Sequence, residues 1–227
     1  MTCILHIETS TKNCSVSLSK KGKLVSFKEI NTGGFSHAEM LHPLIQDILK
    51  ETETSIKDLQ AVSVSKGPGS YTGLRIGVSA AKGICFAQDI PLISIDSLTV
   101  LAHAVSVDEG LIVPMIDARR MEVYTAVFDK YYNAIEAISA KIIDSASFNQ
   151  FISTQKVVIL GDGAEKCKSV LQADNITFKS DKFPSAKEMI SISYQKYLDK
   201  QFEDVAYFEP FYLKDFVVTP QKKNLQS

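Results

Sequence analysis

The sequence predicts an α/β protein built from two duplicated lobes. In each half an apolar strand ends in an acidic residue, Glu8 or Asp117, and a turn, an alternating strand and a third strand follow. Helices and a further strand complete each half. Such a repeat is typical of duplicated α/β domains that face one another, with the two acids at the cleft between them. The composition agrees, because 45% hydrophobic and 22% charged residues are ordinary for a globular protein of 227 residues.

The first half begins with a meander of three strands that ends near Ile30. Apolar and polar residues alternate in its second and third strands, as expected for strands with one buried face. Ser36 and Glu39 form a capping-box pattern, which predicts a helix that runs to about Lys50. The predicted elements of this half are strands at residues 2–8, 14–19, 24–30, 58–65 and 91–95, and helices at 36–50, 72–87 and 97–105.

The second half repeats this order of strands and ends in a helix. The predicted elements are strands at residues 111–117, 122–128, 134–143 and 156–162, short helices around Phe148 and Val170, and a last helix from Ser185 to about Gln201. We therefore predict an N-terminal lobe at residues 1–107, a C-terminal lobe at 108–219 and a polar tail at 220–227.

Charge and apolar content exclude several classes of protein. The net charge is −1 and the chain has no strongly basic block, so contact with nucleic acid is expected only through a partner that supplies a basic surface. No apolar run approaches the length of a membrane span, and the N-terminus lacks the pattern of a signal peptide. The four cysteines are far apart without a C-x-x-C pair, which predicts reduced thiols in a cytoplasmic protein.

Paired lobes with an acid on each are the plan of actin-like ATPases and sugar kinases. In active members the acids organise Mg²⁺ and phosphates, and glycines nearby let backbone amides approach the phosphate oxygens. The loops after Glu8 and Asp117 contain no glycine, and Arg119 and Arg120 add bulk to the second. We therefore expect no catalytic residue, no required cofactor, and at most weak ATP or ADP binding. The candidate residues of this weak or vestigial cleft are Glu8, Thr9, Ser10 and Asp117. Two ordinary polar turn residues at strand ends remain the alternative explanation of the acids.

A glycine-rich turn, Gly67 to Gly73, joins a predicted strand to a predicted helix. Its G-x-G-x-x-x-G spacing is one residue longer than the dinucleotide fingerprint, and the lysine of a Walker A loop is absent. Asp96, at the end of the next strand, is better explained as a helix cap than as a ribose ligand. No nucleophile elbow surrounds Ser70. The motif therefore does not predict a phosphate site or a hydrolase.

The helix after this turn carries a stripe of small residues that includes Gly73, Gly77, Ala80 and Ala81. Each glycine in a helix costs about 1 kcal/mol relative to alanine, and close packing is the usual compensation. The preceding helix has a broad apolar band. Two explanations remain open: contact with another chain, or close packing on the chain's own sheet. The first predicts that Gly77→Leu abolishes pairing in a folded protein, and the second predicts that it unfolds the chain.

His37 and His42 are the histidines to test as metal ligands. They are five residues apart, which places them about 140° apart around a helix. An H-x-x-x-H pair would place both imidazoles on one side, and this spacing does not. We therefore expect no metal site.

Several motifs together resemble the TsaB family, bacterial subunits of the machinery that makes threonylcarbamoyladenosine in tRNA. They are HIETST at residues 6–11, KGPGSYTGLRIG at 66–77, ISIDSL at 93–98, DARRMEVY at 117–124 and EPFYLKD at 209–215. The last resembles the family's Pro-x-Tyr-Leu-Arg ending, with Lys214 in the place of the arginine. The similarity covers nearly the whole chain, and the GPGSYTGLR stretch is highly specific.

The resemblance implies an actin-like fold with ribonuclease H-like lobes and a non-catalytic scaffold that activates TsaD. TsaD transfers the threonylcarbamoyl group to the adenosine beside the anticodon, the ATPase TsaE joins the complex, and tRNA is reached only through it. TsaB lacks the metal-binding histidines of TsaD, and it can form homodimers when alone. The implied contact uses the first two helices, here residues 36–50 and 72–87. The corresponding interface residues are His37, Met40, Leu41, Leu44, Ile48, Gly73, Arg75, Gly77, Ala80, Ala81 and Ile84.

An enzyme is the rival hypothesis, either an actin-like ATPase or a peptidase, as the former grouping with glycoproteases suggested. The absence of loop glycines argues against the ATPase, and the histidine spacing argues against a metallopeptidase.

Overall fold

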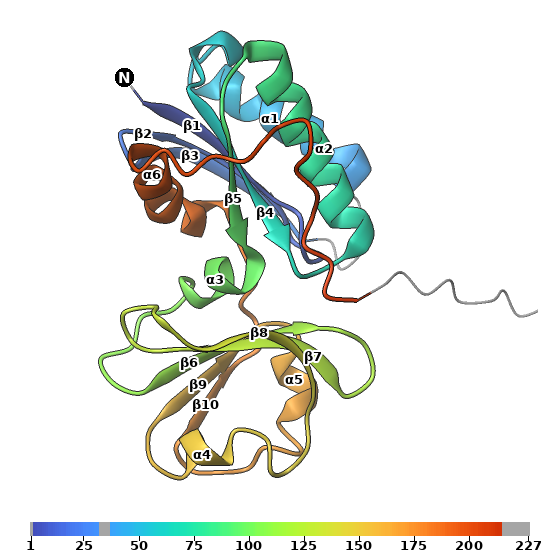
Figure 1. Ribbon diagram of the computed structural model, residues 1–227, viewed down its shortest axis with the longest axis vertical. Helices are drawn as coiled ribbons and strands as arrows, with labels where there is room; N and C mark the ends of the chain where they lie inside the picture. Colours follow the sequence, from blue (N-terminus) through green and yellow to red (C-terminus); the bar gives the residue numbers. More distant parts are fainter. Residues whose placement is uncertain (1, 32–36, 215–227) are drawn as a thin grey trace, which may run out of the picture.

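The computed structural model describes residues 2–31 and 37–214 and shows two five-stranded sheets, each in its own lobe (Figure 1). The first sheet has the order β3-β2-β1-β4-β5, and the second has the order β8-β7-β6-β9-β10. In each sheet the first strand of the lobe is antiparallel to the second and parallel to the fourth. The shared topology confirms the predicted duplication and its actin-like plan.

The strands lie close to where the sequence patterns predict them. Those of the first sheet are β1 (Cys3–Glu8), β2 (Cys14–Lys20), β3 (Lys23–Ile30), β4 (Ala61–Gly67) and β5 (Leu92–Asp96). Those of the second are β6 (Leu111–Asp117), β7 (Glu122–Phe128), β8 (Ala134–Ile142), β9 (Val157–Leu160) and β10 (Ile176–Lys179).

The helices differ in length between the lobes. The first lobe has α1 (His37–Glu51), the short 3-10 helix η1 (Ile56–Asp58), α2 (Tyr71–Gln88) and α3 (Ser97–Ala102). The rest of the chain has α4 (Asn149–Ile152), α5 (Ala164–Cys167), the 3-10 helix η2 (Ala186–Met189) and α6 (Ile190–Leu198). Within the described residues, none of these helices combines the length and apolarity needed to cross a bilayer.

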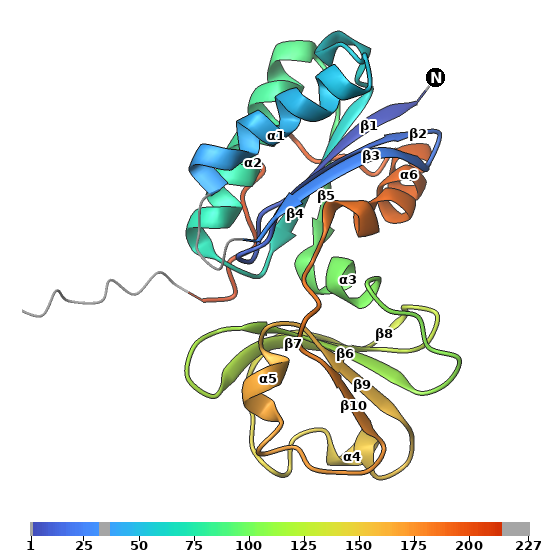
Figure 2. The same cartoon turned by 180° about the vertical axis from the view of Figure 1, so that it is seen from behind.

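Helices α1 and α2 cover one face of the first sheet, and α6 lies on the other face (Figures 1 and 2). Leu41 and Ile48 of α1 and Val78 of α2 pack with the buried strand residues Ile7 and Val64. Helix α3 lies between the lobes and packs on the second sheet through a separate cluster. The core of the first lobe is thus formed between its sheet and the inward faces of α1 and α2.

Some predicted elements differ from the structure. The strand β10 was not predicted, because only four residues, in which Ile176 and Phe178 alternate with polar neighbours, are too short for a clear pattern. Helix α3 ends at Ala102, before the predicted Val105, and the predicted helix from Ser185 to Gln201 is divided into η2 and the shorter α6. The predicted cap Ser36 and the predicted tail at 220–227 lie outside the described residues.

The chain returns to the first lobe after β10. The buried ring of His6 on β1 makes hydrogen bonds with Ser19 Oγ at 2.8 Å and Ser193 Oγ of α6 at 3.1 Å. Residues 203–214, here named the C-terminal strap, then cross β5 and run along α2 (Figure 1). The predicted lobe at residues 108–219 includes this segment, whereas the N–H groups of Glu203 and Phe211 donate to Leu92 O and Lys66 O of the first lobe.

Candidate functional site

The glycine-rich turn between β4 and α2 packs against the loop that follows β1. The backbone N–H of Ser70 donates to the carbonyl oxygen of Ser10 at 2.6 Å. A Cβ atom on Gly69 would lie 2.2 Å from that same oxygen. The glycine therefore permits two backbone segments of the chain to touch, and the space that a phosphate would need is filled by Ser10.

Glu8, Thr9 and Ser10 are buried at this contact, each with 0% exposure. The Glu8 Oε1 atom accepts a hydrogen bond from the N–H of Ser10 at 2.6 Å. Burial raises the pKa of Glu8 to about 7, although its bonds to Ser10 and Ser65 oppose the rise. The Glu8 carboxyl group is thus enclosed by the chain itself and is not accessible to a ligand in this structure.

Asp117 lies in the second lobe and is exposed. Its carboxylate accepts from the N–H of Arg119 at 2.9 Å and forms an ion pair with Lys166. The bond from the N–H of Arg119 closes the tight turn into β7, in which Arg119 has a φ of 71°. The nucleotide cleft thus stays a prediction, and the geometry favours the alternative, in which Glu8 and Asp117 are polar residues at strand ends.

Most predicted interface residues belong to the inward faces of α1 and α2. Their side chains are buried in the chain's own core or, for the glycines, face it, so a partner cannot reach them. This corrects the prediction for His37, Leu41, Leu44, Ile48, Gly73, Gly77 and Ala81. Met40 and Ile84 are partly exposed, Arg75 is exposed, and Ala80 retains 9% exposure at the edge of a groove.

The small-residue stripe shows why the prediction for Gly77 was wrong. A Cβ atom on Gly73 would lie 2.1 Å from Thr9 O, and one on Gly77 would lie 2.2 Å from Thr9 Oγ1. Thr9 Oγ1 also donates to the carbonyl oxygen of Gly73 at 2.8 Å. The stripe therefore packs on the β1–β2 loop, and Gly77→Leu is expected to disrupt the fold rather than a contact with a partner.

A second row of small residues lies on the outward face of α2. A Cβ atom on Gly83 would meet nothing within 4 Å, and Ser79 and Ala87 are exposed one turn to either side. Gly83 and Ala87 belong to the small-residue surface that the sequence gives this helix, but none of the three is among the predicted interface residues. Their spacing of four residues was the available signal, but the same spacing relates Gly73 to Gly77.

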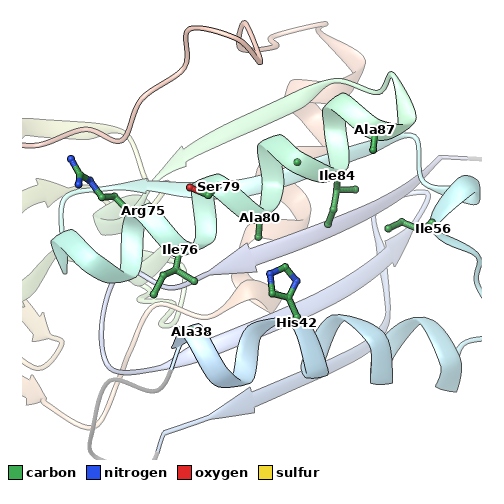
Figure 3. Close-up of a pocket in the computed structure, with 10 residues that line it drawn as sticks. Ala38, His42, Ile56, Arg75, Ile76, Ser79, Ala80, Ile84 and Ala87 are labelled. Carbon is green, nitrogen blue, oxygen red and sulfur yellow. The ribbon is translucent and has the colours of Figure 1, made fainter.

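Helices α1 and α2 enclose a groove beside this row, with a volume of about 610 Å³ (Figure 3). In the figure Ile76, Ala80 and Ile84 of α2 point toward the side on which His42 of α1 projects. The complete lining is Ala38, His42, Ile56, Arg75, Ile76, Ser79, Ala80, Gly83, Ile84 and Ala87. Such a shallow, mainly apolar surface between two helices is suited to bind another helix.

The two histidines considered as metal ligands lie in different environments. His37 is buried and its Nε2 lies 2.7 Å from Thr11 O, whereas His42 is exposed in the groove. Within residues 2–31 and 37–214, no group of three His, Cys, Asp or Glu side chains has the geometry to hold a metal.

Comparisons with a family model and with known proteins point to the same pathway. Residues 34–221 match the family model described as TsaD, tRNA N6-adenosine threonylcarbamoyltransferase. The tRNA threonylcarbamoyladenosine biosynthesis protein TsaB of Escherichia coli (strain K12) is 29% identical over 224 residues, which cover 94% of this chain and 95% of that protein. The protein of the same name from Bacillus subtilis (strain 168) is 36% identical over 132 residues, or 58% of this chain and 57% of that protein.

Two further similarities concern the fold and the transferase. The structure of YeaZ from Pseudomonas aeruginosa superposes with a TM-score of 0.81 at 22% identity and covers 94% of this chain and 100% of that chain. The tRNA N6-adenosine threonylcarbamoyltransferase of Staphylococcus aureus (strain Newman) is 33% identical over 128 residues, which cover 50% of this chain and 38% of that protein. The chain therefore belongs to the TsaD family and, within it, to the TsaB group.

Proposed function

We propose that this chain is a non-catalytic, cytoplasmic subunit of tRNA threonylcarbamoyladenosine biosynthesis that binds a TsaD-type transferase through the α1–α2 groove. A TsaE-type ATPase and tRNA join through that complex. The chain itself needs no cofactor, and a second copy can occupy the groove when the transferase is absent. The names of the TsaB relatives support the pathway, and the groove supports the mode of action.

The observation that carries this proposal is the uncovered apolar groove. Ile56 retains 36% exposure, and nothing in residues 2–31 and 37–214 fills the space beside Gly83. Removing such a surface from water is favourable by about 25 cal/mol per Å². A helix of a partner can approach α2 closely at Gly83, where no side chain holds it away.

The similarity to the transferase supports a helix pair as the occupant. The Staphylococcus aureus transferase shares 33% identity with this chain over 128 residues. A lobe of similar fold would offer a pair of helices of its own, and two helix pairs can pack face to face as a four-helix bundle. The same argument accounts for pairing between two copies of this chain.

The test is a binding titration between the purified chain and the TsaD-type transferase of the same organism. Gly83→Phe should abolish binding, because its ring would occupy the groove, while the melting temperature stays close to that of the wild type. The matched control is Ala140→Phe, an exposed small residue of β8 on the second lobe, which should bind normally. Normal binding by a folded Gly83→Phe variant would refute the groove as the interface.

A further inference from the structure

Arg75 lies at one end of the groove and is held there by two aromatic side chains. Its guanidinium carbon is 4.2 Å from the centre of the Tyr71 ring, one helical turn earlier on α2. Its Nε donates a hydrogen bond to the hydroxyl of Tyr212 at 3.2 Å. The rings of Tyr71 and Tyr212 are 4.8 Å apart. The guanidinium therefore has a defined orientation on an exposed surface.

The C-terminal strap that carries Tyr212 is attached to the first lobe by its backbone. The N–H of Phe211 donates to Lys66 O at 2.7 Å, and the Lys82 Nζ donates to Ala206 O at 3.1 Å and Phe208 O at 2.8 Å. Two motifs of the sequence, GLR in α2 and PFYLK in the strap, thus meet at Arg75 and Tyr212. Their contact is present before any partner arrives.

Arg75 is the one permanently charged residue in the lining of the groove. Arg75 takes part in none of the ion pairs of the described residues. The hydrogen bond to Tyr212 raises the pKa of its guanidinium, and the charge of Glu209 in the strap adds a smaller effect in the same direction. The bond to Tyr212 uses Nε and leaves the two Nη atoms to bind another group. A protein that covers the groove would remove this cation from water, which is costly unless an opposite charge meets it.

We propose that Arg75 pairs with an aspartate or glutamate side chain of the protein that occupies the α1–α2 groove, and that Tyr212 of the strap is its positioning residue. The inference rests on the proposed function, since it names the chemistry of the same partner. The planar guanidinium matches a carboxylate with two parallel hydrogen bonds. An orientation fixed in advance lowers the entropy cost of forming them. The partner segment is thus an apolar helix with one acidic residue at the end that faces Arg75.

The experiment is a titration with the TsaD-type transferase at low and high salt. Arg75→Gln should weaken binding about tenfold at low salt and should show a flatter dependence on salt than the wild type. Tyr212→Phe keeps the ring on Tyr71 and loses the acceptor, so it should weaken binding about threefold. In the double variant Tyr212→Phe should add no further loss, because it acts through Arg75.

The control is Lys23→Gln, an exposed cation at the start of β3, which should bind like the wild type. Binding by Arg75→Gln within twofold of the wild type at both salt concentrations would overturn the inference. Equal losses in Arg75→Gln and Lys23→Gln would also overturn it, because they would indicate general attraction rather than one pair. A wild-type chain that does not bind the transferase would instead refute the proposed function.

Discussion

At the scale of single residues, Glu8 couples the stability of the first lobe to pH. Its pKa rises from an ordinary value of 4.5 to about 7 because the side chain is buried. Between these values the folded chain holds a proton that the unfolded chain has released, so the free energy of unfolding falls as pH rises, by about 1.4 kcal/mol per pH unit. His6 acts in the opposite direction, since burial lowers its pKa from 6.5 to about 3.

Glu8→Gln should remove this contribution while the amide oxygen of the new side chain still accepts from the N–H of Ser10. The measurement is urea unfolding of both proteins at pH 5, 6, 7 and 8. The variant should gain stability relative to the wild type as pH rises from 5 to 7, and the difference should level off above about 7. His6 is present in both proteins and cancels in this difference. Parallel stability curves would show that Glu8 is not buried as described.

Sequence patterns located Glu8 and Arg75 but could not orient them. The place of Glu8 at the end of β1 followed from the apolar run before it. Its complete burial depends on Ser70 and Gly69, which lie about sixty residues later in the chain. No residue within HIETST indicates that contact. The motif was therefore equally compatible with Glu8 in an open cleft and with Glu8 in a closed turn.

At the scale of elements, α2 presents two rows of small residues with opposite roles. Gly77→Ala should lower the free energy of unfolding by about 1–3 kcal/mol, because the added methyl group overlaps Thr9 Oγ1. Gly83→Ala should raise it by up to about 1 kcal/mol, because alanine is the better helix former and its Cβ meets nothing within 4 Å.

Thermal and urea unfolding of the two variants give the comparison directly. Thr9→Ala combined with Gly77→Ala should recover part of the loss, since the overlapping atom is the Thr9 hydroxyl and the Thr9 Cβ lies at an acceptable 3.4 Å. Equal stabilities of Gly77→Ala and Gly83→Ala would contradict the assignment of the inward and outward rows.

The long elements were predictable, whereas their outward faces were not. Helix α1 follows from its capping-box pattern and its periodic apolar residues, and α2 from the helix-like run after the glycine-rich turn. The cap of α2 was not predicted: the Ser70 hydroxyl accepts from the N–H of Gly73 at 3.3 Å. The prediction of which face of α2 meets a partner was wrong, because glycine and alanine permit close packing inside the chain as well as against another chain. The strap was not predicted as an element, because it has no periodicity and is held by contacts distant in sequence.

At the scale of the whole molecule, the two lobes share the order of their strands but differ in the helices that cover their sheets. The first lobe has helices α1 of 15 residues and α2 of 18, whereas their counterparts α4 and α5 have 4 residues each. In the part of the second lobe that the structure describes, no comparable pair of long helices is present. The strap connects the lobes through the ion pair of Lys214 with Glu122 of β7. The repeat of strands was predictable from the sequence, but the return of the chain to the first lobe was not.

The most direct test of a non-catalytic role through the α1–α2 groove is threonylcarbamoyl transfer to tRNA by a TsaD-type transferase, reconstituted with a TsaE-type ATPase in the presence and absence of this chain. The wild type and Glu8→Gln should support transfer equally, because the buried carboxyl has no chemical role in the proposed function. Gly83→Phe should give no support although it folds, because its groove is filled. Full activity of Gly83→Phe together with loss of activity in Glu8→Gln would contradict the account and favour an enzymatic role for the first lobe.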